Sequence, residues 1–167
     1  MITGFQFRAA KGVLNLQMKN IALAIGVHQE TVIQWSARTA NFDFLPCNVR
    51  KINAIEQYFN TYNITFHKDN GMSLQDNQYR FSNNQLTMTR FQLKAARIAL
   101  KMTQKELAFY IKVSPAAISR LEMLKNKEYI KSLRLDTYKL RYSFEKTGIF
   151  FPNDLYIFLL KDPKFVF

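Results

Sequence analysis

The side chains that could carry out catalytic or metal chemistry are few, and they do not form the groupings that such chemistry requires. His28 and His67 are the only histidines, and neither has a carboxylate or a cysteine at a metal-ligand spacing. Cys47 is the only cysteine, so the sequence predicts no internal disulfide and no cysteine-based metal site. There is no glycine-rich phosphate loop, no nucleophile elbow and no paired acid and base. We therefore expect no enzymatic activity, no metal and no cofactor.

Basic side chains are the informative group. The chain has 24 Lys and Arg against 12 Asp and Glu, and its net charge is +12. The excess is uneven, because residues 84–167 carry a net charge of +9 and residues 1–83 only +3. Four cations follow one another closely, with Glu128 as the only acid among them: Lys125, Lys127, Lys131 and Arg134. This pattern favours a polyanionic partner, and it places most of the attraction in the second half.

These side chains lie on a sequence that occurs twice. Residues 5–35 align with residues 91–121 at a shift of 86, and eight identical residues coincide: Phe5, Gln6, Ala9, Ala10, Leu14, Ala22, Ile25 and Val27 with Phe91, Gln92, Ala95, Ala96, Leu100, Ala108, Ile111 and Val113. Further along the shift is 85, and three more residues coincide: Phe59, Ile64 and Phe66 with Phe144, Ile149 and Phe151. Such a long period predicts two domains of one kind, 1–74 and 86–167, joined by a polar linker, 75–85.

Each copy has the helical spacing of apolar residues, followed by a change of period. First helices are expected to end at Asn15 and Lys101. Further helices are predicted in pairs, one in each copy: 17–25 and 103–111, then 28–38 and 114–123, then 49–61 and 135–146. Hairpins follow, with strands at 64–66 and 72–74 in the first copy and at 149–151 and 155–160 in the second.

Local signals mark the ends of the helices in the second copy. Thr103 with Glu106 has the spacing of a capping box. Ser114 is a good N-cap, and Pro115 fits the first helical position because its missing N–H costs nothing there. Gly26 supplies a tight turn in the first copy, but Lys112 stands at that place in the second. The second turn should therefore be strained if its backbone needs a positive φ at Lys112.

The second copy resembles the Cro/cI-type helix-turn-helix family, also called the XRE family. The resemblance is carried by Met102-Thr-Gln104-Lys-Glu-Leu107-Ala108, by Val113-Ser114 and by Ile118-Ser-Arg120-Leu121-Glu122. With the repeat, it covers most of the chain. It implies a mainly α fold of two tandem lambda-repressor-like helical domains, each followed by a short β-hairpin. It also implies that the third helix of each unit enters a major groove about 12 Å wide.

The resemblance assigns DNA-contacting positions in both copies. In the second copy they are Gln104, Ser114, Pro115, Ala116, Ala117, Ser119 and Arg120, with Lys125, Lys127 and Lys131 as phosphate clamps. Arg120 has the chemistry to bind a guanine or a phosphate, whereas the Pro-Ala-Ala run offers only apolar contact to thymine methyl groups. In the first copy they are Gln29, Glu30, Thr31 and Gln34. Met18 replaces the expected Gln there, so a docking role without DNA is the alternative for that copy.

The family also pairs an Arg of the first helix with a Glu near the end of the third. The matching residues in the second copy are Arg97 and Glu122, and we expect them to form an ion pair. The first copy has Lys11 and Ser36 at these positions. We therefore expect the first copy to lack the pair and to be less rigid.

The aromatic C-terminal segment, which runs through 165–167, is too apolar for an exposed sheet edge. In one arrangement the two hairpins join in a single sheet, and the chain is an intramolecular pseudo-dimer whose third helices face one duplex. In the other the C-terminal hairpin pairs across a two-fold axis and makes a homodimer. We favour the homodimer, because the C-terminal hairpin is far more hydrophobic than the first.

The composition is that of a folded protein, with 48% hydrophobic and 22% charged residues. No apolar run approaches the roughly 18 residues of a membrane span, and no signal-peptide pattern is present, so we expect a cytoplasmic, nucleoid-associated protein without membrane contact. The sequence thus predicts a bacterial or phage transcriptional regulator that binds double-stranded DNA sequence-specifically, with RNA polymerase as a candidate partner. The alternatives are an adaptor or antitoxin-like protein whose helix-turn-helix units bind protein, and a non-specific architectural DNA binder.

Overall fold

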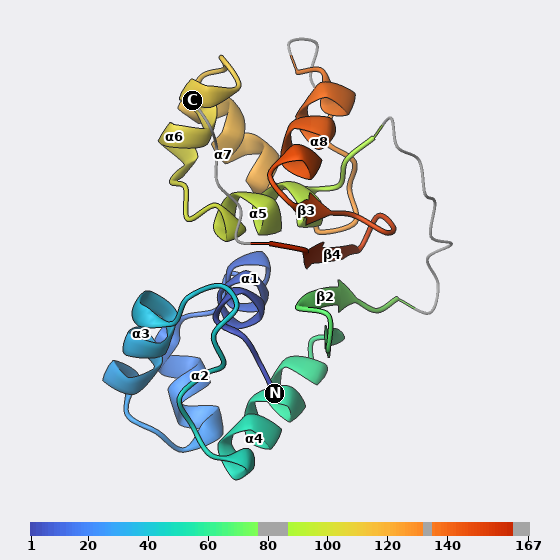
Figure 1. Cartoon of the computed structure of the whole chain (residues 1–167). Helices are drawn as coiled ribbons and strands as arrows, with labels where there is room; N and C mark the ends of the chain where they lie inside the picture. Colours follow the sequence, from blue (N-terminus) through green and yellow to red (C-terminus); the bar gives the residue numbers. More distant parts are fainter. Residues whose placement is uncertain (77–86, 132–134, 162–167) are drawn as a thin grey trace.

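The computed structural model describes residues 1–76, 87–131 and 135–161. These residues form a mainly α protein with a small antiparallel sheet, as predicted (Figure 1). The first half contains α1 (Gly4–Val13), α2 (Met18–Ile25), α3 (Gln29–Arg38), α4 (Val49–Asn60), β1 (Ile64–His67) and β2 (Gly71–Leu74). The second half has the same order of elements: α5 (Arg90–Ala99), α6 (Gln104–Tyr110), α7 (Pro115–Met123), α8 (Thr137–Lys146), β3 (Ile149–Phe150) and β4 (Tyr156–Leu159).

Capping residues set the start of the principal helices. Thr3 and Thr89 each close a capping box, with Gln6 and Gln92 respectively, at the start of α1 and α5. The predicted capping box of Thr103 and Glu106 opens α6. Helix α8 begins later than predicted, at Thr137, because the side chain of Asp136 caps it by accepting the N–H of Lys139.

The N-terminus of helix α7 and the turn before it follow the prediction. Ser114 caps α7, and its hydroxyl accepts the N–H of Ala117, with Pro115 at the first helical position. The preceding turn needs a left-handed residue in both halves, with φ +65° at Gly26 and φ +57° at Lys112. Lys112 thus adopts a left-handed backbone conformation, which is unfavourable for an L residue other than glycine. This is the strain that the sequence predicted for the second turn.

The two hairpins join in one four-stranded antiparallel sheet of order β1-β2-β4-β3. Strand β2 pairs with β4, with Met72 opposite Ile157 and Ser73 opposite Tyr156 (Figure 1). The arrangement that we favoured from the sequence, pairing of the C-terminal hairpin across a two-fold axis, is therefore wrong for β4. Both edges of that strand are occupied within the chain, by β2 and β3.

The apolar character of the second hairpin is explained by this burial. Leu155, Ile157 and Leu159 are fully or almost fully buried. On the other face Phe158 stacks on Phe150, with ring centroids 5.3 Å apart. Phe150 and Phe158 are half-buried on that face, so this aromatic contact covers it only in part. The predicted aromatic residues at 165–167 lie outside the described part of the chain, as does most of the predicted linker, 75–85.

The two halves also meet through α1 and α5, which lie side by side at the centre of the molecule (Figure 1). The packing is close, since a Cβ added to Gly12 would lie 2.2 Å from Cδ1 of Ile98. Buried polar groups cross the same interface. Arg90 donates to the carbonyl of Val13, and Asn41 donates through Nδ2 to the carbonyl of Ala99 at 3.0 Å. These bonds satisfy the last carbonyls of both helices and hold α1 and α5 in register.

Candidate nucleic-acid interface

Helices α6 and α7 are two short helices joined by a tight turn and locked together by small and apolar residues. Ala108 of α6 and Ile118 of α7 are fully buried. The N–H of Val113 bonds back to the carbonyl of Ala108 at 3.0 Å and closes the turn. A side chain larger than Ala at position 108 would separate the helices, because the interior leaves no room for added atoms. The packing thus fixes the direction of α7 and leaves its opposite face open.

An ion pair fixes the far end of α7 to α5. Arg97, in the last turn of α5, donates to both carboxylate oxygens of Glu122, through Nε at 2.5 Å and through Nη2 at 2.8 Å. Its Nη1 donates to the carbonyl of Met102 at 2.7 Å. The Nε2 of Gln104 donates to the same carboxylate at 2.9 Å, so α6 is tied in as well. This fork geometry is the strongest form of Arg–carboxylate contact, and it joins three helices at one buried acid.

The environment of Glu122 keeps its carboxylate charged. Burial raises the pKa of this carboxyl, but the hydrogen bonds from Arg97 and Gln104 and the nearby positive charges outweigh it, so the net pKa is below the ordinary value of 4.5. Lys94 lies 4.0 Å from the same carboxylate. Burial, together with Arg90, lowers the pKa of Lys94 to about 8 in spite of that carboxylate. The cluster has more cations than one acid can neutralise.

The predicted contact residues of the second half divide into outward and structural groups. Pro115, Ala116 and Arg120 are exposed on α7, and Ala117 and Ser119 are half-buried. The exposed residues of α7 are therefore one cation, two small residues and, at its end, the apolar Met123. Ser114 and Gln104 have structural partners, the first as the N-cap of α7 and the second at Glu122.

The cations after α7 are exposed, but one is neutralised. Lys125 and Lys131 are exposed, as a phosphate clamp requires. Lys127 instead forms an ion pair with Asp76, a residue distant in sequence. Arg134 lies outside the described residues. Lys125 and Lys131 therefore remain the candidates for backbone contact on this segment.

In the first half, α3 presents Gln29, Glu30 and Gln34 as exposed residues, with Thr31 half-buried. It has no counterpart to the Glu122 cluster, since Ser36 occupies the position and is buried. Arg8 holds the end of α3 instead. Its Nη1 donates to the carbonyl of Ser36 at 3.3 Å, and its Nη2 donates to Oδ1 of Asn41 at 2.6 Å. The end of α3 is thus held through neutral oxygens, whereas the end of α7 is held through the carboxylate of Glu122.

Sequence reasoning missed the residues that connect the two halves. Arg90 is buried, donates through Nε to the carbonyl of Glu122 at 3.0 Å, and also contacts Val13 and Asn126. Asn41 and Asn126 lie at corresponding positions, and each holds an arginine. Their shift of 85 was a signal that could have been found, because it equals the shift of the later repeated residues.

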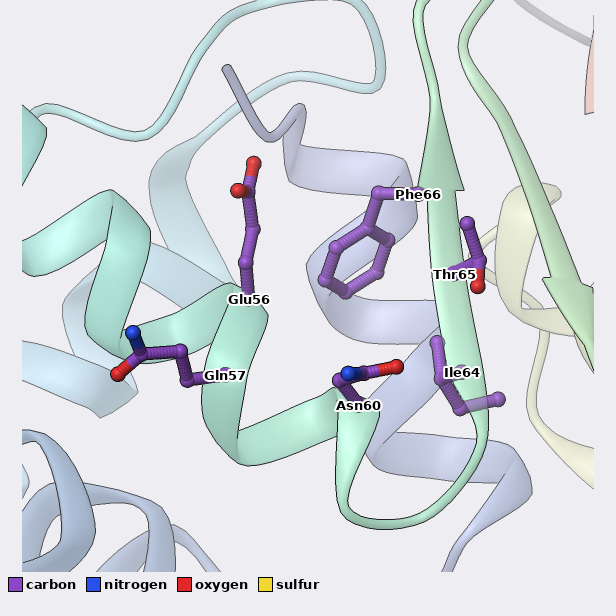
Figure 2. Close-up of a pocket in the computed structure, with 6 residues that line it drawn as sticks. All are labelled: Glu56, Gln57, Asn60, Ile64, Thr65 and Phe66. Atoms are coloured by element: carbon purple, nitrogen blue, oxygen red, sulfur yellow. The ribbon is translucent and has the colours of Figure 1, made fainter.

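A hollow lies between α4 and β1, away from the helix-turn-helix of the second half (Figure 2). Its lining residues are Glu56, Gln57 and Asn60 of α4 and Ile64, Thr65 and Phe66 of β1; the ring of Phe66 points toward α4, whereas Gln57 points away from β1. Glu56 lies 3.9 Å from the amino group of Met1. No cation is among the described side chains that line this hollow, so its chemistry does not suit phosphate. Within the described residues there is no grouping of His, Cys, Asp and Glu that could hold a metal, and no helix long and apolar enough to cross a membrane.

Comparison with known proteins gives one family match. Residues 93–126 match a helix-turn-helix family model. The match spans most of α5, all of α6 and α7 and the start of the basic segment. It supports a DNA-binding regulator of the helix-turn-helix class in general. The searches of curated proteins and of solved structures found no significant match.

Proposed function

We propose that the chain is a sequence-specific, DNA-binding transcriptional regulator with two tandem helix-turn-helix units of the XRE type. Helices α3 and α7 enter the major groove of one duplex, and Lys125 and Lys131 contact the phosphate backbone. The protein acts by occupying a promoter, without catalysis or cofactor, in the compartment that holds the DNA. The proposal takes one chain as the DNA-binding unit, since the sheet joins the two hairpins and with them the two units.

The observation that carries the proposal is the outward face of α7. Arg120 and the Pro-Ala-Ala run are presented by a helix whose inner face is fixed by Ile118 and by the buried Glu122. A helix that is fixed on its inner face and exposes an arginine on its outer face, inside the segment that matches the family model, has the arrangement that major-groove insertion requires. The net charge of +12 supplies the general attraction to phosphate.

In this proposal the role of α3 is to recognise the base sequence of the DNA. Gln29 and Gln34 are exposed on α3, and an amide side chain can bind adenine through N6 and N7. The exposed face of α7 is poor in hydrogen-bonding groups apart from Arg120. We infer a division of labour in which the second half supplies most of the affinity and α3 supplies much of the base discrimination.

One observation favours a second candidate function, an adaptor that binds protein. Leu23 on α2 and Phe109 on α6 are 85% and 83% exposed, and they occupy corresponding positions in the two halves. Each has a lysine four residues before it, Lys19 and Lys105. Exposed apolar side chains of this kind suit a protein partner, and RNA polymerase is the candidate that agrees with a regulator.

The direct test is the affinity of Arg120→Ala for duplex DNA, with Lys68→Ala as the matched control. Lys68 is an exposed cation in the β1–β2 turn, remote from α7, and its loss changes the net charge equally. We expect Arg120→Ala to weaken binding by about 1–3 kcal/mol and Lys68→Ala to change it little. Equal affinities for both variants would contradict the proposal. Full DNA binding in Arg120→Ala together with loss of a protein complex in Phe109→Ser would favour the adaptor.

A further inference from the structure

The four-stranded sheet has one face that belongs to the hydrophobic core and an outer face that does not. Side chains alternate between the two faces along each strand, and residues paired across strands share a face. Met72 and its partner Ile157 are core residues, so their neighbours Ser73 and Tyr156 lie on the outer face. The outer face is thus made of side chains that lie outside the described core.

Aromatic rings cross the outer face from one edge of the sheet to the other. The register places four residues in one row across the strands: His67, Gly71, Phe158 and Phe150. Phe150 stacks on Phe158 with ring centroids 5.3 Å apart, and Tyr156 stacks on His67 with ring centroids 4.6 Å apart. A tilted contact of 6.3 Å between Tyr156 and Phe158 joins the two pairs. We call these four half-buried rings the aromatic face: His67, Phe150, Tyr156 and Phe158.

Three contacts hold the rings of Tyr156 and His67 in place. A Cβ added to Gly71 would lie 2.6 Å from Cε2 of Tyr156, so this ring occupies the space that a side chain at position 71 would need. The Tyr156 hydroxyl donates to Oδ2 of Asp69 at 2.9 Å, and Nε2 of His67 shares a hydrogen bond of 2.8 Å with Oγ of Ser73. Burial and Asp69 raise the pKa of Tyr156 to about 12, so this ring is neutral at physiological pH. Rings fixed in this way lose little conformational freedom when a partner stacks on them.

Exposed cations lie at one end of the sheet. Strands β1 and β4 run in the same direction, because each pairs antiparallel with β2. Lys68 directly follows β1, and Lys161 follows β4 after the exposed Leu160, so the two exposed lysines share that end. The acid of the same turn, Asp69, is bound by the hydroxyl of Tyr156. Lysines at this end favour an anionic partner over a second copy of a chain whose net charge is +12.

We propose that the aromatic face binds single-stranded nucleic acid. Unpaired bases stack on the rings, and phosphates of the strand lie near Lys68 and Lys161. Fixed aromatic rings with lysines beside them match the two chemistries that such a strand presents, the π-faces of its bases and its charged backbone. This site differs from the proposed duplex site, because a duplex keeps the faces of its bases stacked inside the helix. DNA and RNA strands share this chemistry, and two probes distinguish them.

The first test measures the fluorescence anisotropy of labelled oligothymidylate and oligouridylate, each about ten nucleotides long, with the full chain. Phe158→Leu removes one ring and keeps an apolar side chain, and Phe109→Leu on α6 is the matched control. We expect Phe158→Leu to weaken binding by about 5- to 150-fold, as for the loss of one stacked base, and Phe109→Leu to leave it unchanged. Equal affinities for the two variants, both folded, overturn the inference. Tighter binding of one probe identifies the preferred strand as DNA or RNA.

Lys68→Ala tests the charged end of the sheet while all four rings stay in place. We expect this variant to reduce the slope of log K against log salt by about 0.7 on the single strands. The matched control is Lys105→Ala, which removes an exposed lysine of α6 and should leave the slope unchanged. Equal slopes for the two variants contradict a strand that runs past Lys68.

Arg120→Ala separates this inference from the proposed function. We expect it to lose duplex affinity and to keep its affinity for the single strands, whereas Phe158→Leu does the reverse. If Arg120→Ala weakens both ligands equally, the single strand occupies α7 and the assignment to the aromatic face is wrong. If the wild type binds the single strands but no duplex, the proposed function fails and this inference stands. The inference fails if the wild type binds neither probe. It also fails if Phe158→Leu alters only self-association in sedimentation, because the aromatic face is then a protein interface.

Discussion

Replacing Glu122 by Gln tests the buried cluster that holds α7 in place. The side chain of Glu122 is 2% exposed, and its carboxylate accepts hydrogen bonds from Arg97 and Gln104. Glutamine keeps the shape but removes the charge and turns a donor toward the Arg97 guanidinium. Arg97 and Lys94 then stay buried without a compensating anion, and breaking such a pair costs about 3–5 kcal/mol. A protein of this size is stabilised by about 5–15 kcal/mol in total, so the loss is a large fraction.

The assay is thermal unfolding followed by circular dichroism, with Glu128→Gln as the matched control on an exposed residue. About 3–5 kcal/mol corresponds to a fall of about 6–20 °C in melting temperature for a chain of this length. The control should fall by less than about 2 °C. The double variant Arg97→Met with Glu122→Leu should recover much of the loss, because it removes both charges together. Equal melting temperatures for Glu122→Gln and Glu128→Gln would refute the argument.

The pH dependence of the difference in melting temperature between the wild type and Glu122→Gln gives an independent check. Glu122 has a pKa below its ordinary value of 4.5, because the hydrogen bonds and charges around it outweigh the opposing effect of burial. The stability that it contributes is therefore complete above pH 4.5 and is lost as the pH falls through its lower folded-state pKa. The gap in melting temperature between the wild type and Glu122→Gln should narrow below pH 4.5. A constant gap down to pH 3 would show that the carboxylate charge is not its source.

Three further predictions concern the scaffold. Gly4→Ala should lower the free energy of unfolding by about 2–3 kcal/mol in urea titrations, because its Cβ would lie 2.2 Å from the carbonyl oxygen of Ala40; an unchanged midpoint would contradict this contact. Lys112→Gly should raise the melting temperature by about 2–4 °C, since φ +57° strains an L residue, and a fall would mean that the turn is not strained. Burial and Arg90 lower the pKa of Lys94 from 10.5 to about 8, so the unfolded state binds the proton of this lysine more tightly than the folded state does. The free energy of unfolding should therefore rise by about 1–3 kcal/mol between pH 8 and pH 10.5. Lys94→Met should lack that rise in urea titrations at the two pH values, and identical pH profiles for variant and wild type would contradict the assignment.

The helices and their ends were largely predictable, because their signals are local. The box of Thr103 with Glu106 and the cap at Ser114 involve residues three apart, and both appear as predicted. The strain at Lys112 followed from its comparison with Gly26. The start of α8 was wrong by two residues, because apolar Leu135 was included in the helix although Asp136 is the better cap.

The joined sheet could not be decided from the sequence. Pairing of β2 with β4 brings together strands about 80 residues apart, and the hydrophobicity of the second hairpin fits a partner strand from the same chain or from another one equally well. The structure places the fully buried Ile157 opposite Met72 of the same chain.

The candidate site was predictable only within each helical unit. Family resemblance led to Arg97 and Glu122, and the structure brings them into contact. The partners of Arg90 and Arg8 depend on how α1 packs against α5 and on the loop after each third helix, which no local pattern encodes. Lys127 was assigned to phosphate because its neighbours in sequence are basic, whereas its ion-pair partner Asp76 belongs to the other half.

The central claim is specific binding of DNA by two helix-turn-helix units in one chain, and selection of bound sequences from a random duplex pool tests it most directly. The purified protein is used at about 150 mM salt, where non-specific attraction is weak. The account predicts a recovered motif with two half-sites about one helical turn apart, because α3 and α7 must reach the same face of the duplex. A pool without enrichment, with binding that disappears as salt is raised, would contradict the account and leave only the attraction of a basic protein to phosphate.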